Sequence, residues 1–509
     1  MSVLFRAVQV YEAGSESGLS APCDVTIEGS RIQSIDKACT ATPVGGTEII
    51  DGHGHLLIPG LINGHFHSSV NHMKGRLDSL PLELFMLYES PALDILRPTP
   101  REAYVRTMLG AMEMLKGGVT AVQDDAFFVP FPTPEIIDAV MQAYEDSGIR
   151  ATVALDQPEL PELNKLPFLA DLLPSAIRAK LARAPEFGQK ELLQSYKHLI
   201  DRWHGAASGR LSAAVSCSAP QRVSPEYFGA LEDLSRSHGL PLYAHMLETK
   251  VQRVLSNEQP RFAGRSLVKY TADLGLLSAR TNIIHAIWVD DTDLDLIARA
   301  GATIAHNPIS NLRLGSGVMP FRSIRDRGIP ICLGVDEAIA DDAVNMWSVV
   351  KMAGLIHNIT SPDPEIWPKA SEVLDCLWHG GARAMGKSGE LGEVAVDRLA
   401  DLTLLNLDTL SFTPLNDLRR QLVYCEDGSS VVLTMVAGRI ICRGGHITTV
   451  DEAALRAEAR ALFDAKMSSL RIASAEAERL RPYYRNMIAK AAAVDVGIER
   501  AVWKTPQSK

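Results

Sequence analysis

The feature that most limits the fold is an alternation of capped helices and short apolar runs in the middle of the chain. Three helix starts place a hydroxyl residue before a proline and a glutamate in the first turn, at Thr99-Pro-Arg-Glu102, Thr133-Pro-Glu135 and Ser224-Pro-Glu226. A capping hydroxyl, a proline at the first helical position and an early acid together favour a helix start. Each predicted helix stops at a glycine, and an apolar run follows it.

Eight apolar runs have the length of buried strands. They are residues 56–62, 119–122, 149–155, 211–217, 240–244, 281–284, 301–305 and 329–333. Eight strands that alternate with helices predict an α/β protein with a (β/α)₈ barrel over residues 57–389. An open doubly wound sheet would show the same alternation, but polar residues at the ends of several strands favour a closed barrel.

The two chain ends have a different pattern. Short apolar runs separated by glycine turns predict strands at 3–10, 23–28, 31–36 and 48–51, and similar runs occur at 400–407 and 431–442. We expect residues 1–56 and 390–449 to form one discontinuous β-sandwich domain. Residues 450–509 predict a helical extension that starts at the capping box Thr449-Val-Asp-Glu452 and is interrupted at Pro482. Its apolar stripe should pack on this molecule or on a partner subunit.

Composition excludes several classes of partner. The chain is 46% hydrophobic and 22% charged, as in ordinary globular proteins, and its net charge of −10 disfavours nucleic acid and anionic membranes. Seven scattered cysteines without a C-x-x-C pair predict reduced thiols. We find no basic-apolar leader pattern and no run of 18 apolar residues, so we expect a cytoplasmic protein.

The first barrel strand ends in two histidines one residue apart, His65 and His67. Residues two apart in a strand point to the same side, so both imidazoles can reach one metal ion. Two surface histidines in a turn are the alternative for an isolated pair. His53 and His55 have the same spacing, but they precede the apolar run and so should lie at its opposite end, with a structural or incidental role.

Other strands carry similar residues at their ends. Strand five is followed by His245 and Glu248, strand six by His285, and strand eight by Asp336. In a closed parallel barrel these side chains converge on one mouth. Three imidazoles and a carboxylate suit one divalent ion, Zn²⁺ first, with Fe²⁺ or Mn²⁺ as alternatives. A water on such an ion can fall from a pKa of 15.7 to about 7.

The motifs resemble those of the amidohydrolase superfamily, and more narrowly its branch of cytosine and guanine deaminases, S-adenosylhomocysteine deaminases and triazine hydrolases. The likeness is carried by Pro59-Gly-Leu-Ile-Asn-Gly-His65-Phe-His67, His245-x-x-Glu248, His285, His306-Asn-Pro-Ile-Ser-Asn311 and Gly334-Val-Asp336, with Ala400-Asp-Leu-Thr and Val436-Ala-Gly-Arg439 at the chain end. It covers nearly the whole chain and stops near residue 450.

The resemblance implies a role for each of these residues. It implies that the metal ligands are His65, His67, His245 and Asp336. Glu248 would carry a proton to the ring nitrogen and then to the leaving group, Asp336 would take the proton of the water, and His285 would orient the hydroxide. The sequence around His306 predicts a rigid loop rather than a group of ligands.

Substrate contacts are less specified. We expect them from His72 after strand one, Gln221 after strand four, Asn307 after strand seven and Glu337 after Asp336. For Asp124 and Asp125, placed after strand two, the sequence does not decide whether they contact the substrate. Glu337 stands where the deaminases of this branch commonly have glycine, which favours the triazine hydrolases. Residues 217–224 lack the histidine of the adenosyl-type enzymes, so a nucleoside substrate is disfavoured.

The sequence therefore predicts a metal-dependent aminohydrolase that adds water to an amidine-like carbon of a small N-heterocyclic substrate and releases ammonia or an amine. Hydrolytic dechlorination, or cleavage of an amide or urea bond, would use the same site. A barrel kept only as a non-catalytic scaffold is the alternative from another class. We also expect a homodimer or a higher homo-oligomer.

Overall fold

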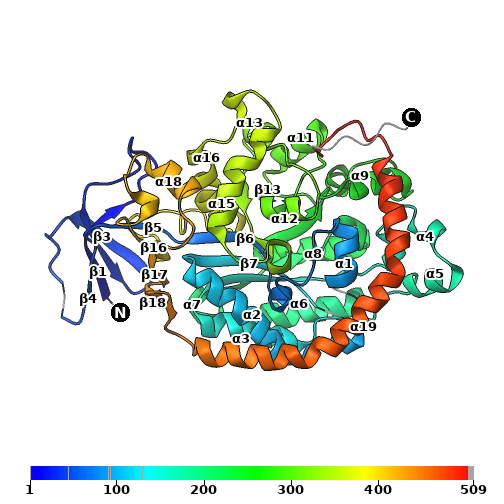
Figure 1. The fold of residues 1–509 in the computed structure, drawn as a ribbon, viewed down its shortest axis with the longest axis horizontal. Helices are drawn as coiled ribbons and strands as arrows, with labels where there is room; N and C mark the ends of the chain where they lie inside the picture. The colour runs from blue at the N-terminus through cyan, green and yellow to red at the C-terminus, as the bar shows by residue number, and fades with distance from the viewer. Residues whose placement is uncertain (1, 44, 90, 92, 129, 502–509) are drawn as a thin grey trace.

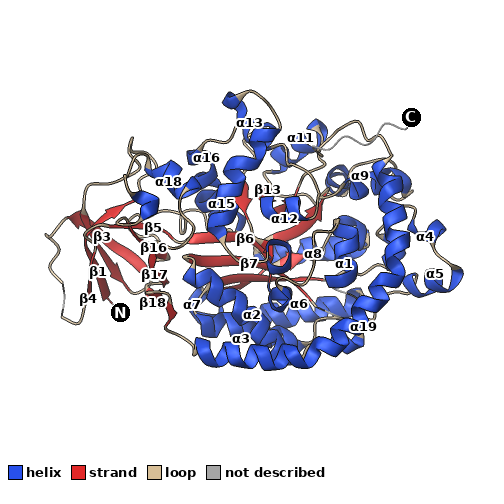
Figure 2. Cartoon of the chain, in the orientation of Figure 1, coloured by secondary structure: helices blue, strands red, loops and turns tan. Residues whose placement is uncertain are grey.

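A computed structural model describes residues 2–43, 45–89, 91, 93–128 and 130–501. A sheet built from both ends of the chain lies on one side of the molecule, and a barrel surrounded by helices forms the rest (Figures 1 and 2). The long helix α19 (Glu452–Ala492) runs along α2 (Pro100–Lys116) and then turns up past α4 (Leu169–Leu172) and α9 (Lys250–Glu258).

Within the residues that the structure describes, the barrel consists of eight parallel strands, two of them interrupted. They are β6 (Leu61–His67), β7 (Val119–Phe127), β8 (Arg150–Asp156), β9 (Leu211–Ala213) with β10 (Val215–Ser216), β11 (Leu242–Met246), β12 (Thr281–His285), β13 (Thr303–His306) and β14 (Ile331–Leu333) with β15 (Asp336–Glu337). Hydrogen bonds join them in two arcs, β15-β6-β7-β8-β9 and β10 to β14. The interrupted strands belong to both arcs, and β14 contacts β6, so the predicted barrel closes.

The predicted first strand, 56–62, is wrong as a single element. The structure divides it at Gly60 into β5 (His55–Pro59), which pairs with the end sheet, and β6, which enters the barrel. At this turn the backbone passes so close to Thr120 that a Cβ at position 60 would lie 2.1 Å from Thr120 Oγ1. Because both halves are apolar, hydrophobicity alone conceals the division.

In the described part of the chain, the end sheet has nine strands, which come from both chain ends. They are β1 (Ser2–Val10), β2 (Cys23–Glu28), β3 (Arg31–Lys37), β4 (Glu48–Asp51), β5, β16 (Leu402–Asn406), β17 (Val431–Val436), β18 (Arg439–Arg443) and β19 (His446–Ile447). Strands from the two chain ends share one hydrophobic core, in which Val3 and Phe5 pack with Leu402 and Met435. The two ends therefore combine as predicted, while the exact domain boundaries at 56 and 389 stay a prediction.

Helices cover the outside of the barrel and the mouth. Besides α2, α4, α9 and α19 they are α1 (Leu82–Glu89), α3 (Pro134–Ser147), α5 (Ser175–Leu181), α6 (Gln189–Trp203), α7 (Ala206–Gly209), α8 (Pro225–His238), α10 (Leu267–Asp273), α11 (Asp291–Ala300), α12 (Pro308–Arg313), α13 (Phe321–Asp326), α14 (Ala338–Asp341), α15 (Met346–Leu355), α16 (Ala370–Asp375), α17 (Gly381–Ala384) and α18 (Leu418–Tyr424). The three predicted starts are present. Thr99 and Ser224 cap their helices by accepting a backbone N–H, whereas Thr133 makes no such bond.

The C-terminal helix differs from its prediction in two respects. Its cap is Asp451, which accepts from the Ala454 N–H at 3.0 Å, while the Thr449 hydroxyl donates to the Ser147 carbonyl. Pro482 does not interrupt it, because α19 is one helix of 41 residues that contains this proline. A proline weakens a helix locally, but the buried side chains of Tyr484 and Met487 hold the following turns against the barrel helices.

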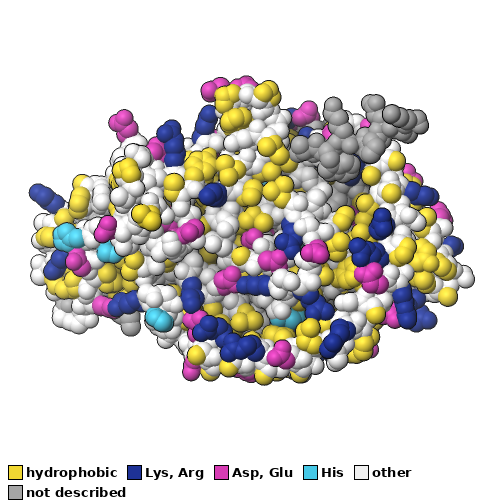
Figure 3. Space-filling view, in the orientation of Figure 1, with side chains coloured by type: hydrophobic (Ala, Val, Ile, Leu, Met, Phe, Trp, Pro, Cys, Tyr) yellow, Lys and Arg dark blue, Asp and Glu magenta, His cyan; other side chains and the backbone are white. Residues whose placement is uncertain are grey.

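Two global features bear on the expected partners. Among the described residues, none of the helices combines the length and hydropathy that a bilayer-spanning segment needs. Acidic and basic side chains are interspersed over the face shown in Figure 3, so the net charge of −10 is not gathered there.

Candidate active site

The carboxyl ends of four barrel strands bring the predicted ligands and His285 together. His65 and His67 come from β6, His245 from β11, His285 from β12 and Asp336 from β15. All five side chains are buried, with at most 5% of each residue exposed. They are up to 271 positions apart in the sequence (336 minus 65), so their proximity results from closure of the barrel.

The donor atoms have spacings that a metal ion could bridge. One imidazole nitrogen from each of His65, His67 and His245 lies within 4.8 Å of the other two. Asp336 Oδ1 lies 3.2 Å from His65 Nε2 and 3.4 Å from His67 Nε2. Tetrahedral bonds of 2.0–2.1 Å separate ligand atoms by about 3.3 Å. These residues can therefore surround one ion, which a water would bind as a fifth ligand.

Backbone carbonyls fix two of the imidazoles in the orientation that ligands need. His67 Nδ1 lies 2.5 Å from the Asp125 carbonyl oxygen, and His245 Nδ1 lies 2.8 Å from the Ser218 carbonyl oxygen. A carbonyl can only accept, so each Nδ1 carries the proton and donates it. The Nε2 lone pairs are then directed into the site, which is the usual outer support of a metal-binding histidine.

The charges of the isolated protein suit a cation. Burial and the neighbouring imidazoles lower the pKa of His65 to about 4 and lower that of His245 well below its usual value. Burial alone would raise the pKa of Asp336, but its hydrogen bond to His65 and the nearby imidazoles lower it further than burial raises it. The site thus offers neutral nitrogens and an ionised carboxylate at neutral pH.

Ser310 and Asn311 support this site from α12. The Ser310 hydroxyl donates to Asp336 Oδ2 at 2.6 Å, and Asn311 Oδ1 lies 2.9 Å from His285 Nδ1. The sequence predicted this segment as a rigid loop. The structure shows that the same residues orient a predicted ligand and a predicted catalytic histidine, and their place within the motif after His306 was the available signal.

Glu248 lies on the opposite side of His285 from Asn311. Because His285 Nδ1 donates to Asn311, its Nε2 faces Glu248 Oε2 at 3.6 Å and Asp336 Oδ2 at 3.9 Å. Glu248 is 2% exposed, and among the described residues its Oε1 has no hydrogen-bond partner. Burial and the negative charges of Asp336 and Glu83 raise its pKa well above the usual value.

Left-handed backbone conformations gather at the mouth. Ser218, Leu247, His285 and Asp336 have φ values of 60°, 55°, 73° and 71°. Each such residue costs about 1–3 kcal/mol and persists only where surrounding contacts impose it. Ser218 follows β10, Leu247 follows β11, His285 ends β12 and Asp336 begins β15. The strained backbone therefore occurs at the strand ends that carry the functional side chains.

The predicted substrate contacts are distributed around the site. Glu337 has a carboxylate oxygen within 4.8 Å of ligand atoms of His67 and Asp336, and Asn307 Nδ2 lies 3.4 Å from His285 Nδ1. Gln221 is buried, and its Oε1 has no hydrogen-bond partner among the described residues. His72 lies apart from these, stacked on Phe463 of α19 at 4.5 Å.

Asp124 and Asp125 lie within β7 rather than after it, because this strand continues to Phe127. Asp124 accepts from the Ser68 N–H and the Tyr144 hydroxyl. Asp125 accepts from Ser216 at 3.0 Å, and with Asp156 and His245 it forms a second group of metal-type donors. Sequence reasoning did not single out Asp156 or Ser216, although both stand at the ends of barrel strands.

The other histidine pair is remote from this site, as expected. His53 lies on the surface and contacts Asp51, with 2.6 Å between Nδ1 and the carboxylate.

Comparison with known proteins finds relatives along most of this chain. The profile of the Amidohydrolase family matches residues 56–441. A 5'-deoxyadenosine deaminase of Methanothermobacter thermautotrophicus is 29% identical over 89% of this chain and 95% of its own length. A 5-methylthioadenosine/S-adenosylhomocysteine deaminase of Syntrophomonas wolfei is 29% identical over 81% of this chain and 87% of its own length.

Solved structures share the fold. The zinc complex of an atrazine chlorohydrolase from Arthrobacter aurescens superposes with a TM-score of 0.79 over 90% of this chain and 99% of its own, at 23% identity. An adenosine deaminase from Xanthomonas campestris with bound zinc gives 0.78 over 92% and 98%, at 24% identity. With the profile covering most of the chain, this protein belongs to the amidohydrolase family.

Proposed function

We propose that this amidohydrolase is a zinc-dependent aminohydrolase of an aminated N-heterocycle. The observation that carries the proposal is the group of His65, His67, His245 and Asp336. Beside it lies the carboxyl group of Glu248, whose Oε1 has no hydrogen-bond partner among the described residues. Attack of water on a C=N carbon needs a base for the water and an acid for the nitrogen, and zinc deaminases use a glutamate that is not a ligand for this purpose.

The four ligands would hold the ion. When bound, a zinc ion acidifies water so that hydroxide is available near neutral pH. Zinc is present in two solved structures of the same fold, which supports this choice over iron or manganese.

The chain's own residues divide the proton transfers. Asp336 accepts the proton of the attacking water at Oδ2, the oxygen that faces His285. Glu248 Oε1 donates its proton to the ring nitrogen, takes up the proton that remains on the added hydroxyl, and passes that proton to the departing amine. The proton held by Asp336 then returns to Glu248. His285, fixed by Asn311, contacts both carboxyl groups through Nε2 and keeps them on the same side of the substrate.

Two kinds of contact would select the substrate. Gln221 Oε1 and Glu337 Oε2 are buried acceptors without hydrogen-bond partners among the described residues, and N–H groups of an aminated ring would satisfy them. Asn307 would act through His285, which it contacts. The named sequence relatives deaminate adenosine-type nucleosides, so they do not support the preference for triazines drawn from Glu337.

A panel of aminated purines, pyrimidines and triazines, presented to protein of known zinc content, tests the proposal. Ammonia release in step with zinc content is expected. Release of chloride or of a carboxylic acid in its place would assign the site to dechlorination or amide cleavage, and zinc-loaded protein without any turnover would contradict the proposal. The predicted homo-oligomer and cytoplasmic location also stay proposals, and sedimentation of the purified protein tests the former.

A further inference from the structure

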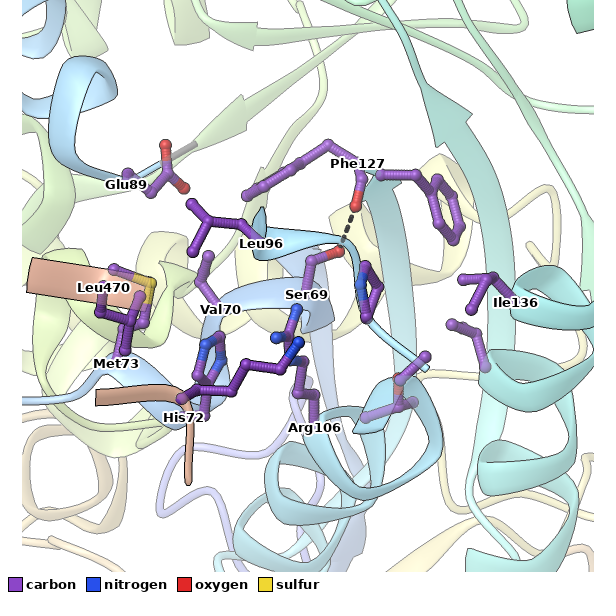
Figure 4. Close-up of a pocket in the computed structure, with 16 residues that line it drawn as sticks. Ser69, Val70, His72, Met73, Glu89, Leu96, Arg106, Phe127, Ile136 and Leu470 are labelled. Atoms are coloured by element: carbon purple, nitrogen blue, oxygen red, sulfur yellow. Dashed lines mark hydrogen bonds between the residues drawn. The ribbon is translucent and has the colours of Figure 1, made fainter. Parts of the chain in front are cut away.

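A small pocket lies beside the metal-ligand group, between the barrel mouth and α19. Its volume is about 50 Å³, and Figure 4 shows His72 and Arg106 on the side opposite Glu89, with Ser69 between them. Polar and aromatic members of its wall include Ser69, His72, Glu89, Arg106, Phe127 and Lys466. Lys466 and Leu470 of α19 complete the wall, so the C-terminal extension is part of this pocket.

The pocket borders the reaction site. Ser69 follows His67 by two residues and donates to the Phe127 carbonyl at 2.6 Å, and the Phe127 ring lies 5.6 Å from the His67 ring. At another wall, Glu89 is hydrogen-bonded to Glu337, whose carboxylate lies near His67 and Asp336. A substrate ring held at the metal could therefore extend a side group into the pocket.

The wall of this pocket carries more positive than negative side chains. Among the described residues Arg106 has no ion pair, and its Nε is buried without a hydrogen-bond partner. The Nδ1 atom of His72 is also buried and unpartnered. Lys466 lies 3.3 Å from Glu102, which partly balances its charge. Arg106 is half-buried, and Glu102, the acid that acts on its charge, forms no ion pair with it among the described residues, so its guanidinium is suited to an anionic ligand.

The two acidic groups nearby are already engaged. Glu102 accepts from the Thr99 N–H and contacts Lys466, and Glu89 is paired with Glu337. Arg76 adds a further positive charge near His72. The pocket volume holds about three to five water-sized groups at roughly 10–15 Å³ each, which is enough for a carboxylate.

We propose that this pocket binds a carboxylate on the substrate, so that the substrate is an aminated N-heterocycle with an acidic side group. The proposal rests on the function proposed above and adds the class of substituent. Arg106 supplies charged hydrogen bonds to the carboxylate, Ser69 and His72 lie in the same wall, and α19 closes the site over the acidic group.

The test compares two ligands that differ only in charge. One aminotriazine carries a carboxymethylamino arm, and its partner carries the isosteric carbamoylmethylamino arm. Zinc-loaded protein should bind and turn over the acid in preference to the amide. Arg106→Met should reduce that preference about 10- to 100-fold, because hydrogen bonds to charged groups are among the stronger ones. Arg106→Lys should restore part of it.

A control variant on the same helix tests whether loss of any arginine from α2 would change the acid-to-amide preference. Arg101 is also on α2 and contacts Glu458 of α19 at 2.6 Å, but it lies outside the pocket and its side chain is 50% exposed. Arg101→Met should leave the acid-to-amide preference as it is. Equal preference in wild type and Arg106→Met, or the same loss in Arg101→Met, overturns the proposal.

Binding measured by calorimetry keeps the two proposals distinct. If neither compound releases ammonia, the proposed function fails, while tighter binding of the acid that depends on Arg106 still supports the pocket. If both compounds release ammonia at equal efficiency and bind equally, the pocket assignment fails and the function stands. Competition by acetate for binding of the acid is expected, and competition by inorganic phosphate but not by acetate would contradict a carboxylate site.

Discussion

Two buried carboxyl groups beside the Nε2 atom of His285 have opposite protonation. Asp336 is held ionised by the imidazoles around it, whereas burial and negative neighbours favour the protonated form of Glu248. Enzymes commonly separate acid and base roles by pushing two pKa values apart in this way. The sequence predicted both residues, but only the structure shows that each lies within 4 Å of the same His285 nitrogen.

Glu248→Gln tests the acid role. The amide cannot transfer the proton, so turnover should fall about 10²- to 10⁴-fold. Metal content should be unchanged, because Glu248 is not one of the four ligands. Activity assay and metal analysis of the same preparation measure both quantities. Near-normal turnover, or loss of the metal, would refute the assignment.

Ser310→Ala tests the support of Asp336. The hydroxyl holds Asp336 Oδ2 at 2.6 Å, and loss of such an outer contact typically reduces metal affinity or activity about 10- to 100-fold. Zinc titration against a chelator measures the change. Ser316 is a matched control, since it is buried nearby and its hydroxyl has no hydrogen-bond partner among the described residues. An equal effect of Ser316→Ala would show that general packing is responsible.

At the level of elements, a buried ion pair joins barrel strand β8 to the end sheet. Arg150 donates to both oxygens of Asp401, at 2.7 and 3.0 Å, and the two side chains are 5% and 1% exposed. Asp401 also accepts from the Ala437 N–H. These contacts give a physical reason for the Ala400-Asp-Leu-Thr and Val436-Ala-Gly-Arg439 segments, because they fix the end sheet to the barrel.

Asp401→Asn should therefore destabilise the whole protein. It leaves the Arg150 charge buried without its partner, which costs about 3–5 kcal/mol in free energy of unfolding. Urea unfolding followed by circular dichroism measures the change. The double variant Arg150→Met with Asp401→Leu should recover much of the loss, since apolar replacement of both partners is often neutral. A double variant less stable than Asp401→Asn would show that the pair is stabilising in itself.

For the whole molecule, α19 contributes to the packing of the barrel's outer helices. Tyr484 and Met487 are at most 2% exposed and pack with Leu84 of α1 and Val254 of α9. The helix thus connects elements on either side of the mouth. Its position makes the extension part of the folded molecule.

Met487→Ala measures this contribution. Removal of a fully buried methionine side chain typically costs 2–5 kcal/mol, because apolar contacts are lost and a cavity remains. We expect a single unfolding transition at lower temperature, recorded by calorimetry. Ile472 lies on the same helix and is 51% exposed, so Ile472→Ala should change stability by less than about 0.5 kcal/mol. Unfolding of α19 in a separate, earlier transition would contradict its integration with the barrel.

Much of the fold was accessible from local patterns. Thr99 and Ser224 start helices because cap and proline act on their immediate neighbours, and the strand ends at His245 and His285 follow from apolar runs of limited length. The division at Gly60 could not be predicted in the same way. It depends on the approach of Thr120, which is distant in the sequence.

The sequence by itself determined the alternation of strands and helices, the joining of the chain ends and the set of strand-end residues that could hold a metal, because these depend on periodicity and residue chemistry. Only the tertiary structure decided which polar groups support that set and where α19 lies. Ser310, Asn311 and the Asp125 carbonyl reach their partners through closure of the barrel. The pocket around Arg106 likewise exists only because helices distant in the sequence pack together.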